Sequence, residues 1–218
     1  PDFCNLSSNE MPGLLYHTLE ESSPLKLKDV PEELLEKIPF FRLMEEFLKI
    51  IQREKAIKTT PLGFLQRKVL TELYAYKFVT SETVESGVSK LNVENDWPAM
   101  YVVHSCAVLA GWMRKTNGKY VLTKAGTRIL EGKHRSEFFS KLLSTYTDQF
   151  PWSDLDGHPP VPVGNLGWGF TIILLLKFGD EPRAKDFNAE KHITAFLDFV
   201  QHFPAGSYNN PQRDVRRC

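Results

Sequence analysis

The sequence predicts a mainly α-helical protein that contains one small β-hairpin. Apolar residues recur at helical three-and-four spacing over residues 40–51, and charged side chains occupy the opposite face. Asn117-Gly118, a dipeptide that suits a two-residue turn, separates two short segments at 112–115 and 119–122. The chain has 218 residues, of which 42% are hydrophobic, so it can bury a substantial core. These properties exclude a chain that is disordered throughout.

The N-terminal part is predicted to contain an arm at residues 1–28 and a helical segment at residues 29–56. The arm mixes Asn, Ser, Pro and Gly with scattered apolar residues, which favours irregular structure. Asp29-Val30-Pro31-Glu32 offers a cap, a first-turn proline and a glutamate for a short helix. A stronger amphipathic helix is expected after Pro39.

Residues 57–135 are predicted to form a separate module around the hairpin. In order, we expect an edge strand near 56–58, a helix at 64–76, a short helix after Thr80, a helix at 98–110, the hairpin, and a last helix through Leu130. Thr123 is expected to cap the last helix, because its hydroxyl can accept a free amide of the first turn.

This order of helices, hairpin and helix resembles a winged-helix domain. The residues that carry the resemblance are Gly111-Trp112-Met113-Arg114, Asn117-Gly118-Lys119 and Leu122-Thr123-Lys124-Ala125-Gly126. More narrowly, residues 60–69 and 94–97 are similar to segments of a group of uncharacterised bacterial winged-helix proteins. The resemblance covers about a third of the chain. It implies a winged-helix module embedded among flanking amphipathic helices, and it implies no known activity.

The remaining segment, 136–218, is predicted to be helical with an internal loop. Helices are expected around 138–146, 170–178 and 193–203, and a Pro/Gly-rich loop is expected at 150–169. The apolar run at 170–176 is too short to span a bilayer, and no secretory signal opens the chain. Pro1 in place of an initiator methionine suggests a piece of a longer polypeptide. Three widely spaced cysteines suit a reducing cytoplasm better than a disulfide framework or a paired zinc site.

The formal net charge of zero hides an uneven distribution. Residues 57–135 hold 12 Lys/Arg and 6 Asp/Glu, a net charge of +6, and the rest of the chain carries −6. A positive module attracts a phosphate backbone. The candidate nucleic-acid contacts are Arg67, Lys68, Arg114, Lys115 and Lys119. A basic face that is merely solvated is an equally good interpretation.

The helix expected to enter a DNA groove is poorly equipped for it. No Lys or Arg lies between Leu91 and Met113, and Glu94 and Asp96 near the helix start would repel phosphates. The candidates for base contact are Tyr101, His104 and Ser105, which are a poor set beside Arg, Asn and Gln. Trp97 and Tyr101 are instead candidate residues of a protein interface.

No pattern in the sequence identifies a catalytic, cofactor or metal site. Asp154, Asp156 and His158 could bind a hard metal ion, but such groups are commonplace in polar loops. The glycine-rich segment 164–169 lacks the strand and the Lys-Ser/Thr pair of a phosphate-binding loop. We therefore predict no catalytic residue, no cofactor, no metal and no enzymatic activity.

Three functions remain open, in this order of preference. The first is a non-catalytic module or scaffold that binds a protein partner or a missing domain of the same polypeptide. The second is a DNA-binding transcriptional regulator that uses the basic wing, with weak and non-specific duplex binding expected. The third is an enzyme whose site lies outside this chain.

Overall fold

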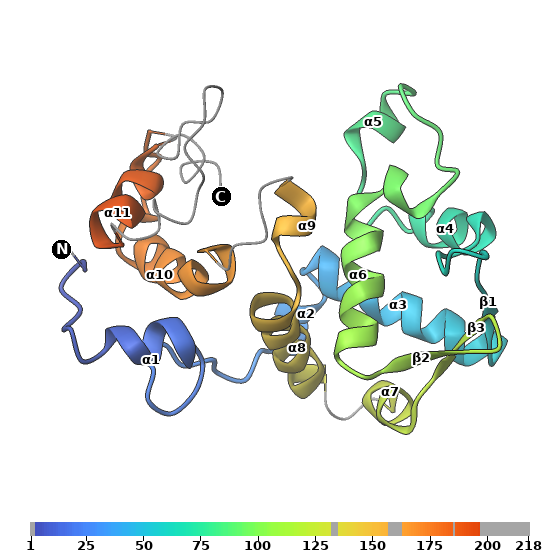
Figure 1. Cartoon of the computed structure of the whole chain (residues 1–218), viewed down its shortest axis with the longest axis horizontal. Coiled ribbons are helices and arrows are strands. Elements are labelled where there is room, and N and C mark those ends of the chain that lie inside the picture. Colours follow the sequence, from blue (N-terminus) through green and yellow to red (C-terminus); the bar gives the residue numbers. More distant parts are fainter. Residues whose placement is uncertain (1–2, 132–134, 157–162, 185, 197–218) are drawn as a thin grey trace. The chain divides into compact units, whose positions relative to one another are not determined.

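The protein is mainly helical and contains one small three-stranded antiparallel sheet (Figure 1). A computed structural model describes residues 3–131, 135–156, 163–184 and 186–196. Its contacts divide the chain into two compact units, one of residues 29–150 and one of residues 1–28 and 151–218. The segments expected at 29–56 and 57–135 both lie in the unit 29–150.

The unit 29–150 contains the sheet and most of the helices. Its elements are α2 (Glu32–Leu35), α3 (Pro39–Glu54), β1 (Ile57–Lys58), α4 (Arg67–Tyr74), α5 (Glu82–Glu85), η1 (Glu94–Asp96), α6 (Pro98–Leu109), β2 (Met113–Thr116), β3 (Lys119–Leu122), α7 (Lys124–Leu130), α8 (Arg135–Ser144) and the π-helix η2 (Thr145–Gln149). The strand order is β1-β3-β2. The predicted fold class, mainly α with a small β-hairpin, is confirmed.

The hairpin turns at Asn117-Gly118, as the sequence predicts. Both residues have positive φ angles, 49° and 69°, which is the backbone that a tight two-residue hairpin requires. Thr116 pairs with Lys119 across the turn, and the ladder continues to the pair of Met113 and Leu122. The edge strand expected near residues 56–58 pairs with β3.

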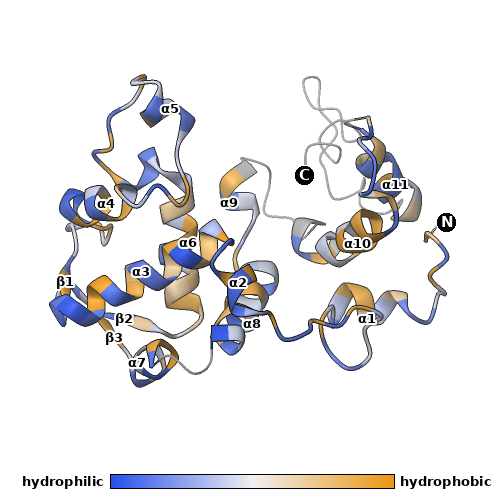
Figure 2. Cartoon of the chain, turned by 180° about the vertical axis from the view of Figure 1, so that it is seen from behind, coloured by the Kyte–Doolittle hydropathy of each residue, from blue (hydrophilic) through white to orange (hydrophobic). Residues whose placement is uncertain are grey.

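The hydrophobic core of this unit is built on α3. Its buried apolar side chains are those of Phe41, Leu43, Met44, Phe47, Leu48, Ile50 and Ile51. Helix α3 contacts β3, α4, α6 and α7, so residues 39–54 share one core with the hairpin module. Helix α6 is hydrophobic along most of its length, in keeping with its position in that core (Figure 2).

The Leu-Thr-x-x-Gly segment at the end of the hairpin has a local structural explanation. The Thr123 hydroxyl accepts a hydrogen bond from the amide of Gly126 at 3.0 Å and donates one to the carbonyl of Gly111 at 2.7 Å. A Cβ on Gly126 would lie 2.0 Å from the carbonyl oxygen of Trp112. Threonine therefore caps α7, and glycine lets α7 approach the start of the wing.

One buried ion pair contradicts the amphipathic pattern of α3. Glu45 belongs to the charged face in the sequence, yet it is only 5% exposed. The guanidinium of Arg135, at the start of α8, donates to both carboxylate oxygens of Glu45, at 2.8 and 2.7 Å. Because the two residues are 90 positions apart, sequence periodicity could not pair them.

The other unit consists of helices α1 (Met11–Tyr16), α9 (Ser153–Asp156), α10 (Val163–Phe178) and α11 (Phe187–Ala195). Leu14, Phe170 and Leu174 are fully buried in its core. Within the described residues of the chain, no helix is both long enough and apolar enough to cross a membrane.

The prediction of an irregular loop at 150–169 was wrong at both ends of that range. Helix α9 lies inside it, and α10 already begins at Val163. Gly169 lies within α10. A Cβ at this position would lie 2.6 Å from the Thr18 side chain and 2.9 Å from the Leu14 carbonyl oxygen, so only glycine allows the contact. This glycine thus serves close packing on the arm, which itself contains α1.

The burial of segment 170–178 and the position of the last helix both differ from the predictions. The segment 170–178 was expected to be buried on every side, but Ile172, Leu175 and Leu176 are exposed. The last helix was expected at 193–203; α11 ends at Ala195, and residues from 197 onward lie outside the described part.

Candidate functional site

The outer face of the small sheet carries only cationic, polar or small apolar side chains. Successive side chains of a strand point to opposite faces. Ile57 and Tyr120 pair with each other and are buried against the core. Their neighbours Lys58 and Lys119, and Arg114 on β2, therefore point to the solvent side, and all three are exposed.

Lys115 reaches the turn that precedes α4. Its Nζ lies 2.9 Å from the position that a Cβ on Gly63 would occupy. The same turn is fixed by Tyr120, whose hydroxyl donates to the carbonyl of Gly63 at 3.0 Å. Gly63 has a φ of 94°, which favours glycine. The ammonium group of Lys115 therefore lies beside the turn rather than on the outer face of the sheet.

Arg67 and Lys68 lie at the start of α4, close to the same turn. Leu65 pairs with Thr59 in an isolated bridge, which connects the approach to α4 with the end of β1. Both cations are exposed. Lys68 also lies near Glu72: a hydrogen bond from Arg53, with a smaller contribution from the charge of Lys68, lowers the pKa of that carboxyl.

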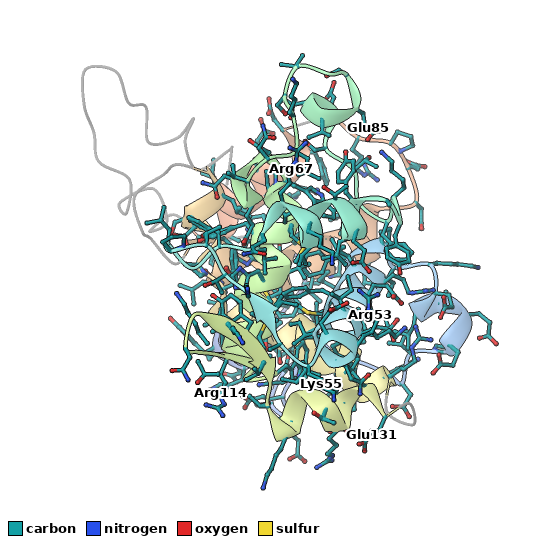
Figure 3. All side chains as sticks on the ribbon, turned by 90° about the vertical axis from the view of Figure 1, so that its right-hand side faces the viewer. Arg53, Lys55, Arg67, Glu85, Arg114 and Glu131 are labelled. Carbon is teal, nitrogen blue, oxygen red and sulfur yellow. The ribbon has the colours of Figure 1, made fainter. Side chains whose placement is uncertain are left out.

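The structure thus brings the sequence-predicted cations together with others from two segments that contain no acidic residue. The segments 55–71 and 113–130 contain no Asp or Glu, and their cations are Lys55, Lys58, Arg67, Lys68, Arg114, Lys115, Lys119, Lys124 and Arg128. We call this set the basic region. Figure 3 looks onto its side of the protein, with Arg67, Lys55 and Arg114 labelled. Among the described residues, eight of the nine form no ion pair; the exception is Arg128, which pairs with Glu137.

Helix α6, which the winged-helix resemblance would place in a DNA groove, is packed on most sides. Met100, Val103, Cys106 and Ala107 have no exposed surface. The predicted base-contacting residues are engaged or shielded as well. Tyr101 packs on Phe150 with ring centroids 6.1 Å apart, His104 is 8% exposed, and Ser105 is half-buried.

The two acidic groups near the start of α6 do not form the repulsive surface that the sequence suggested. Glu94 is 1% exposed, and it accepts from the amide of Leu65 at 3.0 Å. Asp96 accepts from the amides of Asn92 and Val93, which lower its pKa. Both carboxylates therefore stabilise the local backbone.

The two interface candidates have different positions from those expected of an exposed patch. Trp97 is 1% exposed and packs edge-on against Tyr74, with centroids 4.9 Å apart. Tyr101 is half-buried beside Phe150. Trp97 is thus a core residue, and its ring packs on Tyr74 of α4 and does not contribute to an exposed interface.

Residues with possible catalytic or metal chemistry are dispersed. Burial raises the pKa of the Cys106 thiol to about 12, so this thiol is a poor nucleophile. Asp154 and Asp156 lie in α9, and His158 lies outside the described residues. No group of three or more His, Cys, Asp or Glu within the described ranges could hold a metal ion.

A shallow hollow of about 500 Å³ lies in the unit 29–150, between the end of α6, α7 and α8. Its lining is Ala110, Trp112, Ala125, Arg128, Ile129, Glu137, Ser140, Lys141 and Ser144. Val108 and Leu109, at the end of α6, are 44% and 42% exposed. This part of the surface is mainly apolar with a charged rim.

Sequence reasoning missed Lys58 as a member of the candidate site. It lies in a two-residue strand, 61 positions before Lys119 along the chain, and only the strand register brings them together. The absence of acidic residues from both flanking segments was a signal that could have found it.

Comparison with protein families then places the central part of the chain. Residues 36–136 match the Y4jL N-terminal domain. This family is uncharacterised, and the match covers just under half of the chain. The segment similar to the Y4jL N-terminal domain runs from the end of α2 to the start of α8, so it includes the whole sheet and the basic region. No curated protein and no solved structure matches the chain.

Proposed function

We propose that the unit 29–150 is a non-catalytic winged-helix module whose basic region binds the phosphate backbone of nucleic acid without selecting a sequence. The element order α3, β1, α4, α6, β2, β3 and the strand order β1-β3-β2 support the winged-helix assignment. A single observation carries the proposed function: eight exposed cations come from two segments that contain no Asp or Glu, and none of the eight has an ion-pair partner among the described residues.

Unpaired cations on a small rigid scaffold attract a polyanion through counterion release, which depends little on sequence. Sequence selection needs donors and acceptors that reach base edges from an element in the groove. Helix α6 exposes mainly Val108 and Leu109, so it offers little to a base edge. The proposed binding is therefore weak, salt-sensitive and indifferent to base sequence.

A location in the cytoplasm and an absence of catalysis belong to the same proposal. Cys106 is buried and forms no disulfide among the described residues, which suits a reducing compartment. The buried Cys106 thiol and the dispersed carboxylates favour a binding role over a chemical one.

The test is a titration of the full chain with a random-sequence DNA duplex, followed by fluorescence anisotropy at 50 and 200 mM NaCl. If three phosphates are contacted, the affinity falls about 40-fold over this range. The triple change of Arg114, Lys115 and Lys119 to alanine should remove most of the binding. The matched control replaces three exposed lysines outside the basic region, Lys28, Lys37 and Lys141, with alanine, and should retain it.

Two results would overturn this proposal. One is an equal loss of binding in both triple variants, because net charge alone would then account for it. The other is a selected duplex that binds with nanomolar affinity at about 0.15 M salt and a thousandfold preference over random DNA, which is the range of specific regulators.

A second candidate function is the binding of a protein partner, or of another domain of the same polypeptide, through the surface beside α6. The exposed Val108 and Leu109 next to the hollow of about 500 Å³ favour it. Absence of duplex binding at 50 mM NaCl would make this the preferred function.

A further inference from the structure

The pairing of β1 with β3 places two lysines directly opposite each other. Lys58 is the register partner of Lys119. The next pair along the ladder is held by a hydrogen bond from the amide of Thr59 to the carbonyl of Gly118, at 3.0 Å. Because hydrogen-bonded and non-hydrogen-bonded pairs alternate in an antiparallel ladder, the lysines occupy a non-hydrogen-bonded pair, where side chains are closest.

This juxtaposition opposes folding. Like charges directly opposite each other destabilise a strand pair. Neither lysine forms an ion pair among the described residues, and the segments around both contain no carboxylate. Arg114, on the same face of the sheet, adds a third positive charge.

The fold does not need these lysines for the attachment of β1. Ile57 and Tyr120 form the buried pair on the other face. Thr59 adds two hydrogen bonds to the carbonyl of Gly118, from its amide at 3.0 Å and from its hydroxyl at 3.1 Å. An uncharged residue at position 58 or 119 would leave all of these contacts in place.

We propose that Lys58 and Lys119 together hold one phosphate group, on the outer face of the sheet beside Arg114. This inference rests on the proposed function and identifies where one backbone phosphate binds. We call the position between Lys58 and Lys119 the phosphate site. A phosphate between the two ammonium groups accepts hydrogen bonds from both and converts their repulsion into attraction. The strand pair is therefore less stable when free than when an anion is bound.

The experiment measures thermal unfolding of the full chain at 20 and 500 mM NaCl, with wild type, Lys58→Gln, Lys119→Gln and the double variant. Each single change should raise Tm at 20 mM by roughly 1 to 3 °C, because it removes the repulsion. The double change should add little more. At 500 mM the gain should largely vanish, because salt screens the charges. Lys37→Gln, at an exposed lysine of the same unit outside the basic region, is the matched control and should not raise Tm.

A second arm adds inorganic pyrophosphate at constant ionic strength. It should raise the Tm of wild type and of Lys37→Gln, and it should leave the double variant unchanged. Single variants whose Tm at 20 mM is unchanged or lower would overturn the inference. So would pyrophosphate that stabilises the double variant as much as wild type.

A third arm separates this inference from the proposed function. If the phosphate site belongs to a surface that binds the nucleic-acid backbone, Lys58→Gln reduces the slope of log affinity against log salt for the random duplex by about 1. If pyrophosphate raises Tm but the chain binds no duplex, the phosphate site is retained and its ligand is a free phosphate compound. The proposed function is then rejected. If Lys58→Gln leaves duplex binding unchanged and pyrophosphate does not change Tm, the phosphate site is rejected and the proposed function is retained.

Discussion

The Nδ1 atom of His104 lies 2.8 Å from Oε1 of Glu94, and both side chains are buried. The other carboxylate oxygen of Glu94 accepts from the amide of Leu65. The imidazole also packs edge-on against Tyr120, with centroids 4.7 Å apart. Burial, reinforced by the charge of Glu94, raises the pKa of Tyr120. One polar cluster thus connects η1, α6, β3 and the approach to α4, which are the elements that position the basic region.

Replacement of Glu94 should destabilise this unit strongly. Glu94→Ala leaves the Leu65 amide and the His104 ring without their buried hydrogen-bond partner, and each buried polar group left unsatisfied costs about 1–3 kcal/mol. Glu94→Gln retains an acceptor and should cost less. Urea denaturation followed by circular dichroism measures both. A loss below about 1 kcal/mol in the alanine variant would contradict this role.

Gly126 should not tolerate even one added methyl group. A Cβ there would lie 2.0 Å from the Trp112 carbonyl oxygen, so α7 or the start of β2 must move. Gly126→Ala should lower the free energy of unfolding by about 1–3 kcal/mol, although alanine is the better helix former. The control is Ala125→Ser, at an exposed neighbour in the same helix, which should remain near the wild-type value in the same denaturation experiment.

Trp97 should behave as a core residue. Trp97→Ala empties a site that is 1% exposed and should cost about 3–5 kcal/mol. Trp97→Phe should be milder, because the indole Nε1 is buried and has no hydrogen-bond partner among the described residues, so the change sacrifices no hydrogen bond there. Chemical denaturation compares the two variants. Equal stability of the alanine variant and wild type would show that Trp97 lies at the surface.

The unit 1–28 and 151–218 should lose stability in acid through His192. Burial lowers the pKa of this imidazole to about 4, below its ordinary value of 6.5. The unfolded chain therefore takes up the proton first, so stability is full above pH 6.5 and declines as the pH falls towards 4. His192→Gln should flatten that decline in thermal melts. His17→Gln, at an exposed histidine of the same unit, should leave the decline in place.

The sequence by itself determined the elements whose causes are local. Asn117-Gly118 defines the hairpin because few other dipeptides adopt two consecutive positive φ angles. Thr123 caps α7 through a hydroxyl three residues from its amide partner. The apolar spacing of 40–51 is a property of one helix and needs no information from the rest of the chain.

Only the tertiary structure decided which distant groups meet. The glycines of 164–169 indicated a loop, but packing of Gly169 on Leu14 and Thr18 accommodates a helix there. The sequence indicated that Glu94 contributes to an acidic helix start, whereas in the structure it is buried and lies within hydrogen-bond distance of His104. Lys58 became part of the basic region through the register of β1 with β3. Each outcome depends on contacts between residues far apart in the chain, and local spacing carries no information about such contacts.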